Sequence, residues 1–144
     1  RKINYIVVHC SATREGHVLT PEALESGTAV GFRTTGYHYY IRRDGTVLGT
    51  RSLELPGAHC RGHNKYSIGI CYEGGLDARG NPKDTRTPEQ RSALHLLVYQ
   101  LLQQFRNARV CGHRDLSPDL DGDGKVEPWE WVKQCPCFEV SKEF

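Results

Sequence analysis

The sequence lacks the features that mark membrane proteins and nucleic-acid-binding proteins. No apolar run approaches the roughly eighteen residues of a membrane-spanning helix, and the apolar stretch in RKINYIVVHC is too short for a signal-peptide core. The 19 basic and 17 acidic side chains are interspersed and leave a net charge of only +2, so no basic arm suggests a polyanionic partner. We therefore expect a soluble protein with no membrane span and no nucleic-acid partner.

Methionine is absent at every position, and internal repeats, low-complexity tracts and linkers are absent as well. A chain without even an initiator Met is compatible with the removal of a start codon, a signal peptide or a longer N-terminal part, so this end does not indicate localisation. A length of 144 residues with 38% hydrophobic residues suits one core that buries roughly 70% of the surface of the unfolded chain. We expect one domain over residues 1–144, present as a monomer.

The sequence has six cysteines, which could form three disulfides in fifteen ways: Cys10, Cys60, Cys71, Cys111, Cys135 and Cys137. Three of them lie within or at the end of apolar, strand-like runs, where a free Cys behaves as a small buried hydrophobe. Cys135 and Cys137 are separated only by Pro136, a spacing too tight for an easy bridge between them. This pair is better suited to supplying one thiolate ligand to a metal.

Short apolar runs rich in β-branched residues predict the strands of a sheet. The sequence INYIVVH predicts a buried strand over residues 3–9, and two runs around Asp44-Gly45 predict a hairpin, because this dipeptide readily takes the positive φ angles of a tight turn. The runs YSIGICYEGG (66–75) and NARVCGH (107–113) predict two further strands.

One helix is clearly predicted in TRTPEQRSALHLLVYQLLQQF. Thr87 can cap it, Pro88 fits its first turn, and Gln90 completes a capping box. Its apolar residues follow the spacing of one helical face: Leu94, Leu97, Val98, Leu101, Leu102 and Phe105. A weaker helix is predicted near residues 20–24 and a short final one over 127–135. Helices and strands mixed along one domain indicate an α/β fold with helices packed on a central sheet.

The stretch DLDGDGKVEPWEW has the spacing of a calcium-binding loop, D-x-D-x-D-G-x5-E. Its oxygen ligands would come from Asp119, Asp121, Asp123, the backbone carbonyl of Lys125, and Glu130. Gly124 permits the sharp turn that such a loop makes. The alternative is a solvated acidic turn. A calcium ion held in this way would brace a loop and leave little room for substrate chemistry.

A second metal site could form from His9, His113 and Cys135. Each histidine ends a strand-like run, and Cys135 could return to them from the final segment. A catalytic zinc takes three nitrogen or sulfur ligands and keeps a fourth position open for water. The alternative for each histidine is a hydrogen-bonded structural role, and spacing alone does not decide between the two.

Four motifs give the sequence a family resemblance. They are VVHCSAT (7–13), GYHYYIRRDGTV (36–47), GAHCRGHNKYSIGICYEGG (57–75), and GHRDLSPD followed by KQCPCF. Together they resemble the type 2 N-acetylmuramoyl-L-alanine amidases, especially the branch of phage T7 lysozyme, with peptidoglycan recognition proteins as more distant relatives. The resemblance runs from about residue 3 to residue 138 and implies a single domain with a mixed central β-sheet flanked by helices.

The resemblance also implies a site and an activity. The family's zinc ligands fall on His9, His113 and Cys135, its catalytic tyrosine on Tyr37 and its catalytic lysine on Lys133. It implies zinc-dependent hydrolysis of the amide between N-acetylmuramic acid and L-alanine in peptidoglycan, with action on the bacterial cell wall by a phage-lysin-like or exported protein. The loop carrying His59 and Asn64 is implied to line the substrate cleft.

The sequence departs from the T7 branch in two places, and two alternative functions stay open. The acidic loop at 119–130 is an insertion that would reshape the rim of the site, and the segment 22–32 is shortened or altered. The first alternative is a peptidoglycan-binding module without hydrolysis. The second is a calcium-dependent structural or adhesion domain in which the histidines are merely packed.

Overall fold

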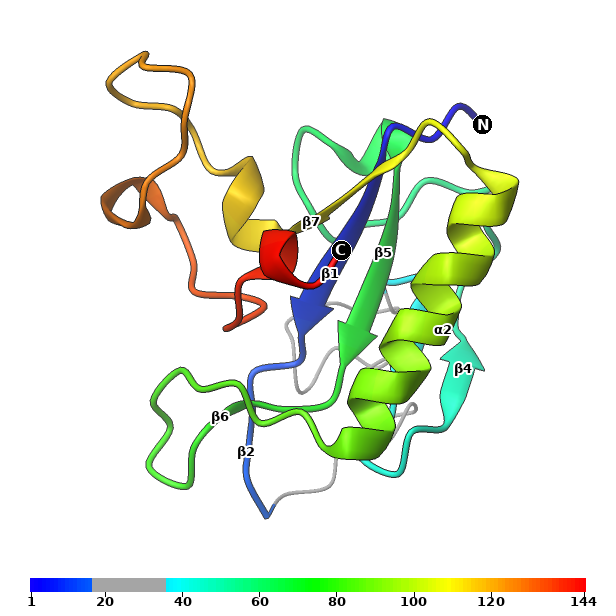
Figure 1. Cartoon of the computed structure of the whole chain (residues 1–144), viewed down its shortest axis with the longest axis vertical. Coiled ribbons are helices and arrows are strands. Elements are labelled where there is room, and N and C mark those ends of the chain that lie inside the picture. Colours follow the sequence, from blue (N-terminus) through cyan, green and yellow to red (C-terminus); the bar gives the residue numbers. More distant parts are fainter. Residues whose placement is uncertain (17–35) are drawn as a thin grey trace.

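The computed structural model describes residues 1–16 and 36–144 of the chain. Its main sheet has the strand order β4-β3-β5-β1-β7. The strands are β1 Tyr5–Cys10, β3 Tyr39–Ile41, β4 Val47–Gly49, β5 Ser67–Tyr72 and β7 Arg109–Gly112. Neighbouring strands are parallel except for the antiparallel pair β3 and β4. The sheet is therefore mixed, as predicted, and β5 occupies its centre, with β1 beside it (Figure 1).

The hairpin predicted around Asp44-Gly45 is confirmed as the connection between β3 and β4. Gly45 has a φ of +88°, a left-handed conformation that glycine adopts without a steric penalty. Asp44 Oδ1 accepts a hydrogen bond from the backbone N–H of Thr46 at 2.9 Å, which fixes the turn.

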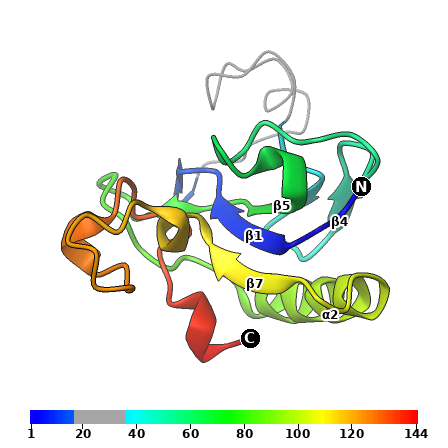
Figure 2. The same ribbon diagram turned by 90° about the horizontal axis from the view of Figure 1, so that it is seen from above.

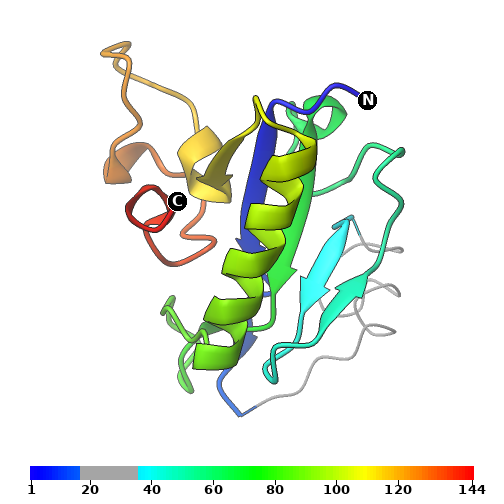
Figure 3. The same ribbon diagram turned by 45° about the vertical axis from the view of Figure 1, so that its right-hand side comes forward.

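The predicted long helix is also confirmed, as α2 over Pro88–Gln104. The Thr87 hydroxyl accepts the backbone N–H of Gln90 at 3.1 Å, and the Gln90 side chain accepts the backbone N–H of Thr87 at 3.0 Å. This reciprocal pair satisfies two backbone donors that the first turn of a helix leaves unpaired. The buried residues of α2 are Gln90, Leu94, Leu97, Val98 and Leu101, and the helix runs along one face of the sheet (Figure 3).

The two faces of the sheet differ because side chains alternate along each strand. Ile6 and Val8 of β1 join Ile70 and Tyr72 of β5 in the core beneath α2. The intervening residues, which include His9 and Cys71, lie on the other face. Figure 2 shows α2 on one side of the sheet and the segment around residues 50–66 on the other. Strand alternation thus turns His9 away from the hydrophobic core and toward the second layer.

The remaining elements are short. β2 (Thr13–Arg14) pairs in parallel with β6 (Gly75–Leu76), and 3-10 turns span Asn64–Tyr66, His113–Leu116, Pro128–Glu130 and Val140–Lys142. The final helix predicted over 127–135 is wrong, because only Pro128–Glu130 forms a single 3-10 turn. Trp131 then has extended backbone, and a proline at 136 disfavours helical geometry in the residue before it.

Two expectations from the sequence concern residues that the structure does not describe. The helix predicted near 20–24 and the altered segment 22–32 lie outside the described residues. Within residues 1–16 and 36–144, no helix combines the length and the apolar character required to cross a membrane.

A buried arginine anchors the C-terminal segment against the rest of the domain. The Arg86 guanidinium pairs with Asp84 at 2.9 Å and with Glu143 at 2.6 Å, and it lies 3.3 Å from the centroid of the Phe138 ring. Its side chain is fully buried, whereas both carboxylates are about a quarter exposed. Because Phe138 follows residues 135–137 directly, this cluster helps to hold the segment that carries Cys135.

Candidate metal centre and active-site pocket

Two histidines meet at one edge of the sheet because β1 and β7 are parallel neighbours. His9 is the fifth residue of β1 and is 1% exposed, while His113 begins the 3-10 turn that follows β7. The centroids of the two rings are 4.6 Å apart. Their position at the carboxyl ends of adjacent parallel strands is where α/β sheets commonly place functional side chains.

Cys135 reaches the same point from the C-terminal segment. The backbone N–H of Cys10 donates to Cys135 Sγ at 3.2 Å, and the Cys135 carbonyl accepts the N–H of Arg114 at 2.9 Å. One ligand atom from each of His9, His113 and Cys135 lies within 4.8 Å of the others. The structure thus brings together the three residues that the resemblance named as ligands.

The two cysteines of the CPC sequence have different surroundings. Cys137 Sγ lies 3.9 Å from Cys10 Sγ and 3.3 Å from the carbonyl oxygen of Gly75, and it is not a member of the metal cluster. All six cysteines are free thiols. Of the pair, only Cys135 is placed to act with the two histidines.

The chemistry of this donor set fits a zinc ion. Burial, followed by the proximity of His59, His113 and Lys133, lowers the pKa of His9 well below its usual value. His9 is therefore a neutral imidazole at physiological pH, which is the form that ligates metals. Two imidazole nitrogens and one sulfur leave one position of a tetrahedral zinc for water or substrate.

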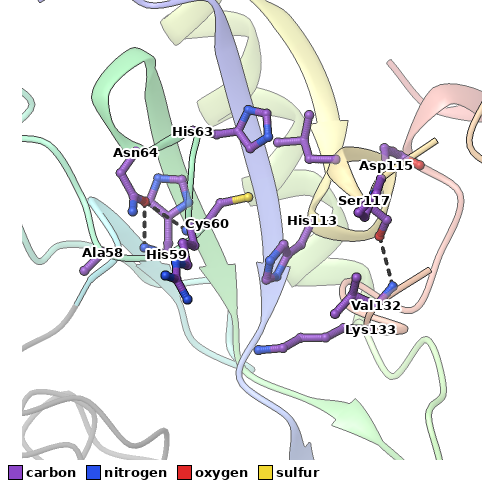
Figure 4. A pocket seen from close by; sticks show the side chains of 13 residues that line it. Ala58, His59, Cys60, His63, Asn64, His113, Asp115, Ser117, Val132 and Lys133 are labelled. Carbon is purple, nitrogen blue, oxygen red and sulfur yellow. Dashed lines mark hydrogen bonds between the residues drawn. The ribbon is translucent and has the colours of Figure 1, made fainter. Parts of the chain in front are cut away.

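An open pocket of about 820 Å³ adjoins the cluster. It is lined by Ala58, His59, Cys60, Arg61, His63, Asn64, His113, Asp115, Leu116, Ser117, Pro118, Val132 and Lys133. Figure 4 shows one wall formed by the loop around His59 and the opposite wall by His113, Lys133 and their neighbours. The pocket falls in the size range of small-molecule sites.

Tyr37 and Lys133 both lie close to the histidine pair. The Tyr37 ring centroid is 5.1 Å from that of His9, and the residue is 7% exposed. Burial, and then the nearby thiols of Cys71, Cys135 and Cys10, raise the pKa of Tyr37, so its phenol keeps its proton at neutral pH. Lys133 is exposed and lines the pocket, and its charge is one cause of the low pKa of His9.

His59 and Asn64 line the pocket, but the structure gives both of them other partners. Asn64 Oδ1 accepts the backbone N–H groups of His59 and Cys60, each at 2.9 Å, and so closes the loop between them. His59 is 6% exposed, and both of its ring nitrogens have hydrogen-bond partners. Burial, followed by the charges of His38 and His113, lowers the pKa of His59 to about 3. Substrate contact by these two residues stays a prediction.

The pocket also contains a carboxyl group that sequence reasoning did not single out. Asp115 Oδ2 accepts the backbone N–H of Gly112 at 2.8 Å and thereby fixes the turn that begins at His113. Burial is the main cause that raises the pKa of Asp115. Its position two residues after His113 in the motif GHRD was the available signal.

The acidic loop gathers its carboxylates as the spacing predicts. Ligand atoms of Asp119, Asp121, Asp123 and Glu130 lie within 4.8 Å of one another. Sequence reasoning missed Glu127, which shares hydrogen bonds with Asp123 and Glu130 that raise its pKa to about 8. The Lys125 backbone N–H donates to Asp123 Oδ1 at 2.9 Å. Calcium binding by this loop stays a prediction.

Comparison with known proteins identifies similar sequences and folds. The family model described as N-acetylmuramoyl-L-alanine amidase matches residues 1–136. The endolysin of Klebsiella phage KP32 is 36% identical over 143 residues, covering 99% of this chain and 85% of that protein. The endolysin of Escherichia phage T7 is 33% identical over 138 residues, covering 95% and 82%.

Solved structures give the same result for the fold. The N-acetylmuramoyl-L-alanine amidase LysC from Clostridium intestinale URNW superposes with a TM-score of 0.70 at 26% identity, covering 99% of this chain and 81% of that one. The peptidoglycan recognition protein PGRP-SA of Apis mellifera has the same TM-score at 21% identity, covering 98% and 80%. The second likeness concerns the fold alone.

Proposed function

Because the chain belongs to the N-acetylmuramoyl-L-alanine amidase family, we propose that it is a zinc-dependent amidase of the bacterial cell wall. The bond hydrolysed is the amide between the lactyl group of N-acetylmuramic acid and L-alanine in peptidoglycan. The observation that carries the zinc dependence is the convergence of His9, His113 and Cys135 beside an open pocket. Residues 1–144 form one amidase domain, monomeric in solution, with the loop 119–130 as an insertion.

The three ligands would leave room for chemistry at the fourth position. When bound, zinc lowers the pKa of a water ligand to about 7 and polarises the carbonyl under attack. Burial of His9 and its neutral state support this assignment, since a charged imidazole cannot ligate. Hydrogen bonds at the Cys135 sulfur and carbonyl hold the third ligand in register with the ends of β1 and β7.

Lys133 and Tyr37 are the chain's own groups for stabilising the oxyanion that develops on the scissile carbonyl. The ammonium of Lys133 lies in the pocket, and the protonated phenol of Tyr37 lies beside His9. Donors that are already in place when the charge develops need no reorganisation, and each is worth on the order of 3 kcal/mol in barrier height. Either group can also pass a proton to the leaving amine.

The alternative of a peptidoglycan-binding module without hydrolysis has less support. A non-catalytic module would not need a cysteine sulfur beside two histidine rings, yet Cys135 is held there by two hydrogen bonds. The pocket wall formed by residues 58–64 would serve substrate binding in either case.

The acidic loop is proposed to hold a structural calcium ion. The spacing of its carboxylates and their convergence within 4.8 Å support this role. The ion would brace the segment that leads from His113 to Lys133 and Cys135, and it takes no part in the hydrolysis.

Digestion of purified peptidoglycan tests the proposed reaction. Zinc-loaded protein is incubated with the polymer and the products are identified by mass spectrometry. The proposal requires stem peptides with a free L-alanine amino group and glycan strands that keep their lactyl carboxylates. Cut glycan strands with intact lactyl-peptide bonds would instead identify a glycosidase, and peptidoglycan that binds without any cleavage would identify the binding module.

A further inference from the structure

The His59 ring occupies a space formed by two residues without side chains. A Cβ atom added to Gly69 of β5 would lie 2.6 Å from both Cγ and Cδ2 of His59, and one added to Gly57 would lie 2.5 Å from its Cδ2. The three heavy atoms nearest to the Gly69 position all belong to this ring. The sheet is therefore built to seat an imidazole at this point, directly beside His9.

His59 is the middle member of a buried hydrogen-bonded chain. His9 Nε2 lies 2.9 Å from His59 Nδ1, and His59 Nε2 lies 3.1 Å from the hydroxyl of Ser67. All three residues are less than 7% exposed. Asn64 holds the backbone of His59 from the other side through its side-chain oxygen. Both the ring and its backbone are thus fixed before any substrate arrives.

The hydrogen bond from His9 determines which of its nitrogens can face an ion. His9 Nε2 is occupied by His59, so Nδ1 is the atom available to join His113 and Cys135. A neutral imidazole that ligates through Nδ1 carries its proton on Nε2 and must donate it. His59 Nδ1 then accepts, and the proton on His59 Nε2 points to the Ser67 oxygen.

We propose that His59 is a positioning residue of the zinc site, which fixes the tautomer and ring orientation of His9 through Nδ1. This inference rests on the proposed zinc site. It assigns His59 a role toward the metal in place of direct contact with substrate. Partners of this kind raise the basicity of the ligand they orient, and their loss typically weakens metal binding by about 10- to 100-fold.

Two substitutions of similar size separate this role from general packing. His59→Asn places the amide oxygen close to the position of the original Nδ1, so the acceptor for His9 is kept and the contact with Ser67 is lost. His59→Gln carries its amide about one bond further, near the original Nε2, so the contact with Ser67 is kept and the acceptor for His9 is lost. Zinc affinity, measured by competition with a chromophoric chelator, is compared for both variants and wild type.

The expected result is near-wild-type zinc affinity in His59→Asn and a loss of about 10- to 100-fold in His59→Gln. The unfolding temperature (Tm) of the metal-free proteins controls for packing. Tm should fall below the wild-type value by similar amounts in the two variants. Equal zinc affinity in both variants and wild type would overturn the proposal. A wild-type protein that binds no zinc would instead refute the zinc site itself, so the two failures are distinguishable.

A third variant displaces the ring without changing any of its nitrogens. Gly69→Ala introduces a methyl group whose three nearest heavy atoms belong to the His59 ring, at a strand position that does not require the positive φ angle of glycine. We expect weaker zinc binding than in wild type, together with an altered absorption spectrum of the cobalt-substituted protein. An unchanged spectrum in a folded Gly69→Ala protein would show that ring placement does not control the ligand.

Discussion

The backbone N–H of Cys10 donates a hydrogen bond to Cys135 Sγ at 3.2 Å. Cys10 follows His9 directly, so this contact ties the end of β1 to a segment that lies more than a hundred residues further along the chain. The sulfur that would ligate the ion is thereby held next to the first imidazole. A backbone N–H donor also stabilises the negative charge of a thiolate.

Substitution of the two neighbouring cysteines should have opposite outcomes. Cys135→Ser removes the sulfur ligand, so bound zinc should fall from about one equivalent per chain and activity should be lost with it. Cys137→Ser should keep both, because Cys137 Sγ contacts Cys10 Sγ and the Gly75 carbonyl and lies outside the cluster of His9, His113 and Cys135. Elemental analysis after gel filtration measures the zinc content. Loss of zinc in Cys137→Ser with retention in Cys135→Ser would reverse the assignment.

Lys133→Ala should retain zinc but lose turnover. Removing one preorganised donor from a developing oxyanion costs on the order of 3 kcal/mol, or about a hundredfold in kcat. Lys142→Ala is the matched control, because that lysine is exposed in the C-terminal turn and does not line the pocket. Kinetics on soluble muropeptides, with zinc content determined in parallel, check the prediction. Wild-type kcat in Lys133→Ala would remove the lysine from the mechanism.

Glu143 should stabilise the fold at neutral pH, and this contribution should be lost at acid pH. The hydrogen bond from Arg86 holds the pKa of Glu143 below its usual value of 4.5. A carboxyl whose pKa is lower in the folded state stabilises the fold above the unfolded-state pKa, and this contribution is lost as the pH falls through the folded-state pKa. Glu143→Gln should therefore lower the free energy of unfolding at pH 7 by less than about 1 kcal/mol, since the pair is partly exposed.

The difference in the free energy of unfolding between wild type and Glu143→Gln should disappear as the pH falls below the folded-state pKa of Glu143. Urea unfolding at a series of pH values measures it, with Glu54→Gln, an exposed loop position, as the control. A difference that grows toward acid pH would have the wrong sign for this mechanism.

Calcium should stabilise the protein through the acidic loop. At a concentration about a hundred times the dissociation constant, a ligand that binds only the folded state adds about 2.7 kcal/mol to the free energy of unfolding. Asp121→Asn should weaken this effect while it keeps the hydrogen bond to the backbone N–H of Asp123, because an amide oxygen also accepts. Thermal unfolding of zinc-loaded protein with and without calcium tests this. No calcium-dependent shift in wild type would identify the loop as a solvated acidic turn.

The sequence predicted those parts of the fold that depend on neighbouring residues. The turn at Asp44-Gly45 and the capping box of Thr87 and Gln90 are local, and both are present in the structure. The short final helix was predicted from a local pattern as well, but tertiary contacts override it. Glu130 accepts the backbone N–H groups of Leu120 and Asp121, so this segment folds back on the acidic loop.

The site was predictable where a motif carries it and unpredictable where it depends on packing between distant segments. His9, His113 and Cys135 could be named from their motifs. The contact between His9 and His59 could not, because it depends on space left by Gly69 across the sheet. The position of His59 within a glycine-bounded loop therefore predicted a residue that lines a substrate cleft. In the structure its ring contacts His9, a candidate metal ligand.

The most direct test of the account is a crystal structure of the zinc-loaded protein, with anomalous diffraction collected at the zinc absorption edge. The account predicts one strong peak about 2.0–2.1 Å from a ring nitrogen of His113 and from Nδ1 of His9, and about 2.3 Å from the sulfur of Cys135. A peak coordinated by other residues, or none between these three side chains, would contradict it.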